Sequence, residues 1–192
     1  MGYLPHVLIG IFILVGIIVI FLVFYFIRTY NNLVSFRNKV RNQKSQIDIE
    51  LKRRFDLVPN LIETVKGYAG HEKSIMDNVL EARNSYVSGS GNTSKALDAD
   101  TALNGALTKL FALTESYPDL KANQNFLKMQ NDLGEIEKRI VFARQFYNDS
   151  VNMLNNKIEM FPSSFVAKTF KFTSETFFEA KEPERENVEV KF

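Results

Sequence analysis

The feature that most constrains the fold is an uncharged apolar stretch close to the N-terminus. The 21 residues from Val7 to Ile27, VLIGIFILVGIIVIFLVFYFI, include no charged side chain. As a helix, such a segment is roughly 30 Å long, which matches the hydrocarbon thickness of a bilayer. A cleaved signal peptide would need a basic start, a shorter apolar run and a small-residue cleavage site, and this sequence has none of them. We therefore predict an uncleaved transmembrane anchor over residues 1–28.

The charges beside this segment predict its orientation. No Lys or Arg precedes it, whereas the first charges that follow it are all basic. Because positive charge is enriched in cytoplasmic loops, this asymmetry places the N-terminus outside the cell and the main domain in the cytoplasm of a single-pass protein. The basic residues are Arg28, Arg37, Lys39, Arg41 and Lys44.

The composition bounds the rest of the chain. With 192 residues, of which 24% are charged and 45% apolar, the chain is large enough for one domain with a core. The net charge is +2, and no Lys/Arg block stands away from the N-terminus, so the sequence predicts no nucleic-acid partner. The absence of cysteine excludes disulfides, thiol nucleophiles and Cys-ligated metals.

Apolar residues recur at spacings of three and four after the anchor, which is typical of helices that bury one face. Pro59 predicts a kink in the first of these helices, and whether Gly67 and Gly70 split that helix is left open. Ser163 or Ser164 can cap a further short helix, FVAKTF. The predicted helical ranges are 33–69, 72–86, 95–117 and 126–161.

Long helices with such stripes can bury them only against one another. The predicted fold class is therefore all-α: an N-terminal transmembrane helix, an antiparallel bundle of three to four long helices, and a short C-terminal helix and tail. We predict that the bundle covers residues 29–170. The tail, residues 171–192, is expected to pack on the bundle through its aromatic residues and to be flexible at its end.

Known catalytic and metal-binding patterns find no match. The pair His71–Glu72 begins a zinc-protease motif, but the second histidine would have to stand where Ile75 does. A bundle di-iron site needs two inward Glu-x-x-His pairs, and the only other histidine is His6. The sequence therefore predicts no catalytic residue, no cofactor and no metal ligand. A carboxylate-only metal site stays open as an alternative, drawn from Glu50, Asp56, Glu63 and Glu72.

Two polar rows are the candidate interaction residues. One lies opposite the apolar stripe of the first long helix, and it is either a solvent face or a partner-binding face. The other borders the stripe of the last long helix with a coiled-coil-like spacing of seven, and it is either an internal seam between helices or the docking surface of a second subunit. The first row is Arg53, Asp56, Asn60 and Glu63, and the second is Gln130, Glu137, Arg144, Asn148 and Asn155.

Several segments in order resemble the LemA family over nearly the whole chain after the anchor. They are YNNLVSFRNKV, IDIELKRRFDLVPNLIETVKGYAGHE, EARNSY, YPDLKANQNF, RQFYNDSVNMLNN and MFPSSFVAKTFKF. The resemblance implies a short N-terminal membrane helix, an α-helical bundle and an N-terminus outside the cell. It brings no catalytic or cofactor residue, and it associates the family with membrane proteases and other envelope proteins.

We therefore expect a non-catalytic scaffold or interaction module in a bacterial envelope assembly. The expected partners are the lipid bilayer, an envelope protein, with a membrane protease as one candidate, and a second copy of the chain. The alternative is a small ligand- or metal-binding sensor or enzyme within the bundle. A sensor would bind its ligand stoichiometrically, whereas a scaffold would copurify with protein.

Overall fold

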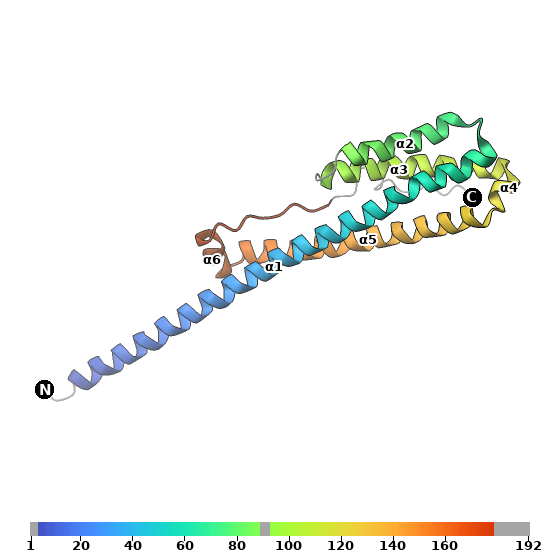
Figure 1. Cartoon of the computed structure of the whole chain (residues 1–192). Coiled ribbons are helices and arrows are strands. Elements are labelled where there is room, and N and C mark those ends of the chain that lie inside the picture. The colour runs from blue at the N-terminus through green and yellow to red at the C-terminus, as the bar shows by residue number, and fades with distance from the viewer. Residues whose placement is uncertain (1–3, 89–92, 179–192) are drawn as a thin grey trace, which may run out of the picture. The chain divides into compact units, whose positions relative to one another are not determined.

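The computed structural model describes residues 4–88 and 93–178. Within these ranges all regular structure is helical (Figure 1). This confirms the predicted all-α class, with a long apolar N-terminal helix, a helical bundle and a short C-terminal helix. The elements are α1 (Leu4–Ala69), α2 (Lys73–Ser88), α3 (Thr93–Leu113), the 3-10 turn η1 (Thr114–Ser116), α4 (Pro118–Lys121), α5 (Gln124–Glu159) and α6 (Ser163–Thr169).

Helix α1 is 66 residues long and continues through Pro59, so the predicted helix after the membrane and the apolar stretch form one element. The chain leaves the helix at Gly70, where an added Cβ would lie 3.2 Å from the Lys66 carbonyl oxygen. Helix α2 starts three residues further on, at Lys73. The first helix therefore continues past Gly67 and ends before Gly70, so the chain is split into two helices at this point.

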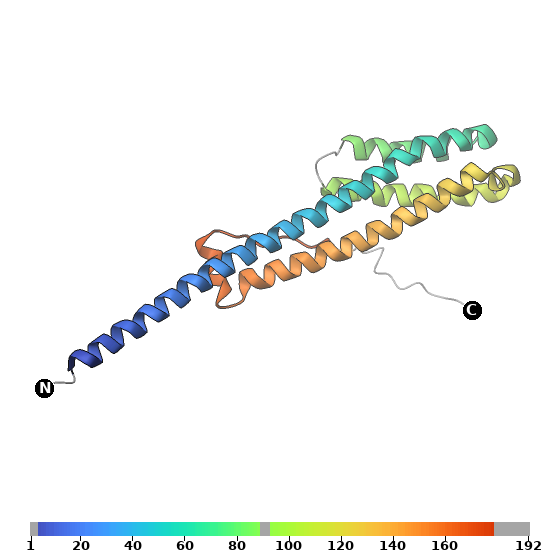
Figure 2. The same ribbon diagram turned by 60° about the horizontal axis from the view of Figure 1, so that its bottom comes forward.

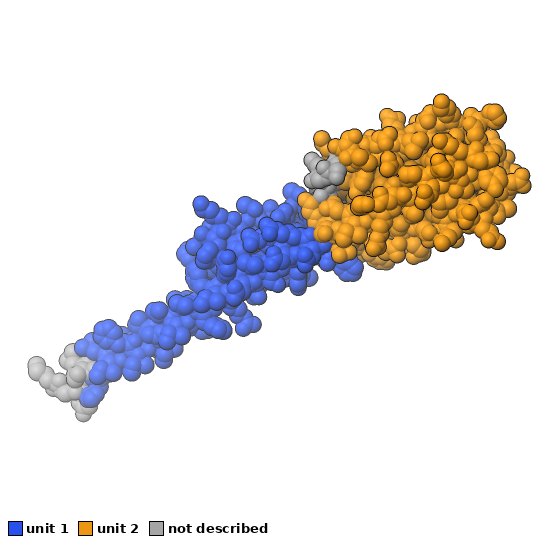
Figure 3. Space-filling view, viewed as in Figure 1, with its two compact units in different colours: residues 1–43, 146–192 blue, residues 44–145 orange. Residues whose placement is uncertain are grey.

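The chain forms two compact units (Figure 3), and by their residue ranges α1 and α5 contribute to both. Unit 1 comprises Met1–Gln43 and Phe146–Phe192, and unit 2 comprises Lys44–Gln145. The predicted bounds of bundle and tail remain predictions, and the last residues of the predicted flexible tail lie outside the described ranges.

Unit 2 is a bundle built from the C-terminal part of α1, the pair α2 and α3, and the N-terminal part of α5 (Figure 2). Asn123 caps α5, because its side-chain oxygen accepts a hydrogen bond of 3.0 Å from the Phe126 amide. The ring of Phe55 stacks on that of Tyr86, with centroids 4.0 Å apart, which ties α1 to α2. The fully buried side chains include Leu51, Phe55, Val58, Leu61, Leu103, Leu110, Phe126 and Ile140.

Unit 1 contains the first part of α1, the last part of α5, α6 and an extended segment, residues 172–178, that we call the strap. Aromatic contacts join these pieces: the ring of Tyr30 lies 4.7 Å from that of Phe170 and 5.9 Å from that of Phe172. The Arg37 guanidinium stands 5.0 Å from the centre of the Phe172 ring. The buried apolar residues of this unit are Leu33, Val40, Tyr147, Val151, Leu154, Val166 and Ala167.

The turn after α6 is a Schellman motif. Lys171 adopts a positive φ of 55°. The Phe172 amide donates to the Ala167 carbonyl at 2.9 Å, and the Lys171 amide donates to that of Lys168 at 3.2 Å. At the other end of α6, Pro162 holds the N-cap position and makes no side-chain cap, so the prediction that Ser163 or Ser164 caps this helix is wrong. Ser163 instead donates to the Met160 carbonyl oxygen at 2.9 Å.

The apolar part of α1 makes no core of its own. It is the one helix in the described ranges that is long and apolar enough to cross a membrane, and its apolar window is wholly unburied by the protein. Large side chains from Leu8 to Phe24 remain about half exposed or more. A bilayer would cover this surface, since a contiguous exposed apolar surface of this size is rare on soluble monomers.

Candidate functional site

The centre of unit 2 contains a buried group of charges that we call the charge cluster: Arg54, Asp100, Asn104, Glu137 and Arg144. Arg54 and Asp100 are almost fully buried. The Arg54 guanidinium donates to the Asp100 carboxylate at 2.7 Å, to the Glu137 carboxylate and to the Asn104 side-chain oxygen. Arg144 donates to the second Asp100 oxygen at 2.9 Å. Two cations and two anions from α1, α3 and α5 thus balance one another.

The electrostatics of the charge cluster centre on Asp100. Burial raises the pKa of Asp100 above its ordinary value, although the neighbouring Arg54 and Arg144 oppose that shift. Glu137 adds to the rise, because a second carboxylate disfavours another negative charge. The two arginines that bond to the Asp100 carboxylate therefore favour its ionised form, against burial and the charge of Glu137.

A second ion group in unit 2 surrounds Glu50, which is mostly buried on α1. Its carboxylate accepts a hydrogen bond from Arg53 at 2.9 Å and lies 3.3 Å from Nε of Arg139. This contact joins α1 to α5. Glu50 therefore has arginine partners, and no group of three or more metal-binding side chains occurs among the described residues.

In unit 1 two asparagines of α5 hold the strap, and we call Asn148 and Asn155 the asparagine clamp. Asn148 donates to the Phe178 carbonyl and accepts from the Phe178 amide, both at 2.9 Å. Asn155 makes the same pair of bonds with Glu175, again at 2.9 Å. Each side-chain amide thus pairs with one backbone residue as a neighbouring β-strand would.

The spacing of the asparagine clamp fits the geometry of its two elements. Asn148 and Asn155 are seven residues apart on a helix, which is roughly 10 Å at 1.5 Å per residue. Glu175 and Phe178 are three residues apart in an extended segment, which is also roughly 10 Å at 3.3 Å per residue. The two distances are equal, so both asparagines can bind the strap at once. Between them, the Tyr147 hydroxyl donates to the Thr176 carbonyl at 3.0 Å.

The predicted polar row on the last long helix is therefore divided between these two sites. All five of its members are half-buried beside the core of α5. Glu137 and Arg144 belong to the charge cluster, Asn148 and Asn155 form the asparagine clamp, and Gln130 borders the core of unit 2.

The predicted row on the first long helix lies on the surface of unit 2, where Arg53, Asp56, Asn60 and Glu63 are all exposed. Asp56 pairs with Lys52 at 2.5 Å. Asn60 lines an open pocket of about 330 Å³ together with Thr64, Asn125, Lys128 and Asp132. The alternative of a ligand sensor would place a small polar ligand here. The four residues of the predicted row thus form an exposed polar face of α1 and do not gather around one point.

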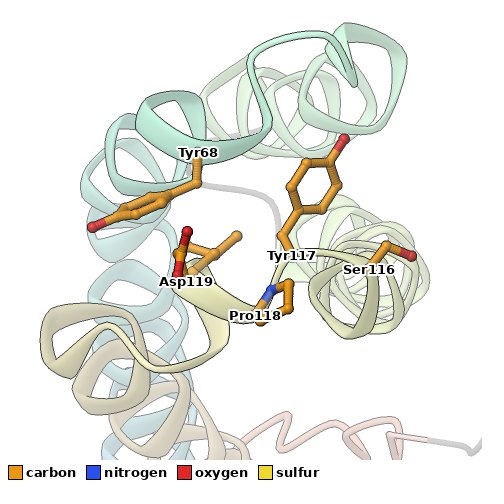
Figure 4. A pocket seen from close by; sticks show the side chains of 6 residues that line it. Tyr68, Ser116, Tyr117, Pro118 and Asp119 are labelled. Carbon is orange, nitrogen blue, oxygen red and sulfur yellow. The ribbon is translucent and has the colours of Figure 1, made fainter.

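A smaller pocket of about 110 Å³ lies where α1 meets the connection from η1 to α4 (Figure 4). Tyr68, Tyr117 and Asp119 line it with their side chains. The Tyr117 hydroxyl is 3.3 Å from a Glu72 oxygen, and the Tyr68 hydroxyl accepts from Asn123 at 2.9 Å. No histidine, lysine or cysteine is among the lining residues of this pocket.

The sequence interpretation missed Arg54 and Asp100, although a signal for them exists. Arg54 stands three residues after Leu51 and four before Val58, which is a stripe position. Asp100 stands four residues after Ala96 and three before Leu103, which is the equivalent position on α3. A cation and an anion on two apolar stripes indicate a buried ion pair, since an unpaired buried charge is costly.

The asparagine clamp can be tested by releasing the strap. We expect Asn155→Ala to speed hydrogen exchange at the Glu175 amide, because its acceptor is removed, and to cost about 1 kcal/mol per lost hydrogen bond. The measurement is amide exchange by mass spectrometry, with Asn156→Ala as control because the Asn156 side chain donates to Asn152 on the same helix, at 3.3 Å, and not to the strap. Equal exchange in both variants would contradict the role assigned to the clamp.

Together, the apolar helix and the charge-balanced bundle define a membrane-associated, all-α bundle protein. The model of the LemA family matches residues 43–192, and the chain belongs to this family.

Curated relatives agree with this assignment. Protein LemA of Metamycoplasma hominis is 24% identical over 170 residues, covering 88% of this chain and 78% of that protein. Magnetosome protein MamQ 2 of Paramagnetospirillum magneticum is 24% identical over 177 residues, covering 79% of this chain and 65% of the relative. Magnetosome protein MamQ of Magnetospirillum gryphiswaldense is 25% identical over the same span and coverage. None of these names denotes a reaction.

Proposed function

We propose that the protein is a single-pass, membrane-anchored scaffold without catalytic activity in a bacterial envelope assembly. In this proposal the apolar part of α1 anchors the chain, the N-terminus lies outside the cell, and the bundle binds a protein partner in the cytoplasm. The partner is a second copy of the chain or another envelope protein, with a membrane protease as one candidate. The names of the MamQ relatives place those proteins in the magnetosome, and an organising role here is consistent with them.

The observation that carries this proposal is an exposed apolar pair on α5 within unit 1. Phe146 and Met153 are seven residues apart, and each side chain is more than half exposed. At 100° per residue they lie roughly 120° from the core residues Tyr147, Val151 and Leu154. Seven-residue spacing presents both side chains to one packed helix, as in a coiled coil. Burying such a side chain contributes about 1.5–3 kcal/mol, so a partner helix has a reason to bind.

The charges of unit 2 support the same proposal. Its buried acids and bases neutralise one another, and the described side chains include no group of three or more that could hold a metal ion. Exposed apolar side chains together with buried charges that pair with one another favour a protein-binding role over a catalytic one.

Crosslinking tests the scaffold. The chain contains no cysteine, so Met153→Cys gives a single reactive site on the exposed pair. In membranes we expect a maleimide–benzophenone crosslinker, which attaches to the cysteine and on illumination to any neighbouring C–H bond, to produce a species that contains a second protein, because a partner helix would cover this face. Asn152→Cys is the matched control, since it is exposed on another side of α5. Absence of any crosslinked species, or equal crosslinking of both variants, would contradict the proposal.

The orientation has a separate test. Ser88→Cys places a thiol at the exposed end of α2 in unit 2. If the bundle is cytoplasmic, an impermeant maleimide should label this site only after the cells are permeabilised. Rapid labelling in intact cells would show the opposite orientation, in which the positive charges after the apolar segment lie outside.

A further inference from the structure

Helix α6 lies beside the end of the apolar segment of α1 in unit 1 (Figures 1 and 2). The rings of Phe26 and Phe165 meet edge to face, with centroids 5.9 Å apart. Between the two helices is an open groove of about 380 Å³ lined by aromatic and aliphatic side chains. The lining residues are Phe21, Leu22, Tyr25, Phe26, Phe161, Pro162 and Phe165.

Helix α6 has two faces of different exposure. Val166 and Ala167 are fully buried against the rest of unit 1. On the outside of the helix Phe165 is 63% exposed, and next to its ends Phe161 is 88% exposed and Met160 and Phe170 are also exposed. Exposure of these apolar side chains to water is unfavourable by about 25 cal/mol per Å² of apolar surface. Contact of this face with another apolar surface would therefore be favourable.

The position of α6 along α1 indicates that this apolar surface is the lipid bilayer. The apolar segment ends at Ile27, so Phe21 lies roughly 9 Å below that end at 1.5 Å per residue. Side chains that contact Phe21 to Phe26 are therefore at the depth of the outermost acyl carbons. Interfacial helices bury their apolar face about 5–10 Å into this same zone.

The charges beside α6 agree with that depth. Lys168 and Lys171 are exposed, and no acidic residue occurs between Met160 and Phe172. Arg28, also exposed, follows the apolar segment directly. Such cations attract phosphate groups at the membrane surface, and aromatic rings beneath them are typical of an interfacial belt.

We propose that α6 is a second membrane contact: Phe161 and Phe165 insert among the lipid acyl chains, and the groove between α6 and α1 holds an acyl chain. Lys168 and Lys171 then face the phospholipid phosphates. This inference rests on the membrane anchoring by α1 that the proposed function also uses. Its consequence is that the bundle is attached to the bilayer by two elements instead of one.

Tryptophan quenching tests this contact, because the chain contains no tryptophan. The full-length variants Phe161→Trp and Phe165→Trp are reconstituted in phosphatidylcholine vesicles with acyl chains brominated near the headgroup end. At an insertion depth of about 5–10 Å, both should lose about half of their emission. The matched control, Phe177→Trp, replaces an exposed strap residue of the same unit and should keep its emission. Leu14→Trp, within the apolar segment, should be quenched by bromine near the chain ends.

The outcomes separate the claims. If Leu14→Trp is quenched while Phe161→Trp and Phe165→Trp behave like the control, α6 does not touch lipid and the inference is overturned while the anchor stands. The inference also fails if these two variants escape quenching but become blue-shifted as the protein-to-lipid ratio rises, since a second copy then covers the groove. An unquenched Leu14→Trp overturns the anchor, and with it both proposals.

Discussion

Replacing Arg54 by methionine is expected to lower the free energy of unfolding of unit 2 by about 3–5 kcal/mol, the cost of leaving a buried charge without its partner. Arg54 donates to Asp100, Glu137 and Asn104 at once. Arg144 bonds to the other oxygen of the Asp100 carboxylate, so it cannot take the place of Arg54. Denaturant titration of the full-length protein in detergent, followed by hydrogen exchange in α2 and α3, measures the effect. Lys66→Met is the matched control, since Lys66 is exposed on the same helix and in the same unit.

The Arg54→Met effect should depend on pH in a direction that identifies Asp100. Burial already raises the pKa of Asp100, and removal of Arg54 takes away a charge that lowers it. Between the ordinary pKa and the raised one, the folded state binds more protons than the unfolded state, so stability falls as pH rises through this window. The loss caused by Arg54→Met should therefore be largest at neutral pH and smaller in acid. A loss that does not change with pH would contradict the assignment.

A double replacement distinguishes pairing from packing. Arg54→Met combined with Asp100→Leu removes both buried charges and keeps apolar volume, so it should recover much of the stability lost in Arg54→Met alone. If the double variant loses more free energy of unfolding than the two single variants lose together, the site requires polar groups for reasons beyond charge balance.

The second large effect concerns the outer members of the charge cluster. Arg144→Ala should cost about 3 kcal/mol, because it leaves the buried Asp100 carboxylate with one guanidinium. Glu137→Ala should cost less, about 1.5 kcal/mol, the lower range for a hydrogen bond to a charged group. The difference follows from exposure, since the Glu137 side chain is 36% exposed and that of Arg144 25%, while its partner Asp100 is only 1% exposed.

The same two variants decide between a seam inside the bundle and a docking surface. We expect lower thermal stability and unchanged crosslinking in membranes, because both side chains bond to residues of their own chain. Glu135→Ala is the matched control, since this residue pairs with Lys138 at the surface. Unchanged melting together with lost crosslinks would show that the row belongs to a partner interface.

Periodicity in the sequence was sufficient to predict the helices, because a helix that buries one face must repeat its apolar residues every three to four positions. It also placed Glu137, Arg144, Asn148 and Asn155 beside the core. Periodicity alone could not say what these side chains contact, since Glu137 is 83 residues from its partner Arg54 in the chain and Arg144 is 44 residues from Asp100. The available signal was that Arg54 and Asp100 occupy positions on apolar stripes. A reading of the stripes by their apolar residues alone passes over these two charges.

The strap shows a second limit of sequence patterns. Its aromatic residues predicted packing, and Tyr147 does lie 4.4 Å from Phe178, measured between ring centroids. The asparagine clamp, however, binds backbone groups, which every non-proline residue carries. A pattern of side-chain types in the strap therefore contains no trace of the contact, and only the spacing of the two asparagines on α5 reports it.

This mode of attachment makes the strap tolerant of change in an uneven way. Because Asn148 and Asn155 bind peptide groups, Glu175 can be exchanged for almost any other residue without losing the contact. Proline at Glu175 or Phe178 is the exception, since it lacks the amide hydrogen that the asparagine accepts. Inserting one residue between these two positions would be equally harmful, because it would shift one peptide group by roughly 3.3 Å along the strap, out of register with its asparagine. The segment is thus constrained in length and in amide content, and nearly free in chemical character.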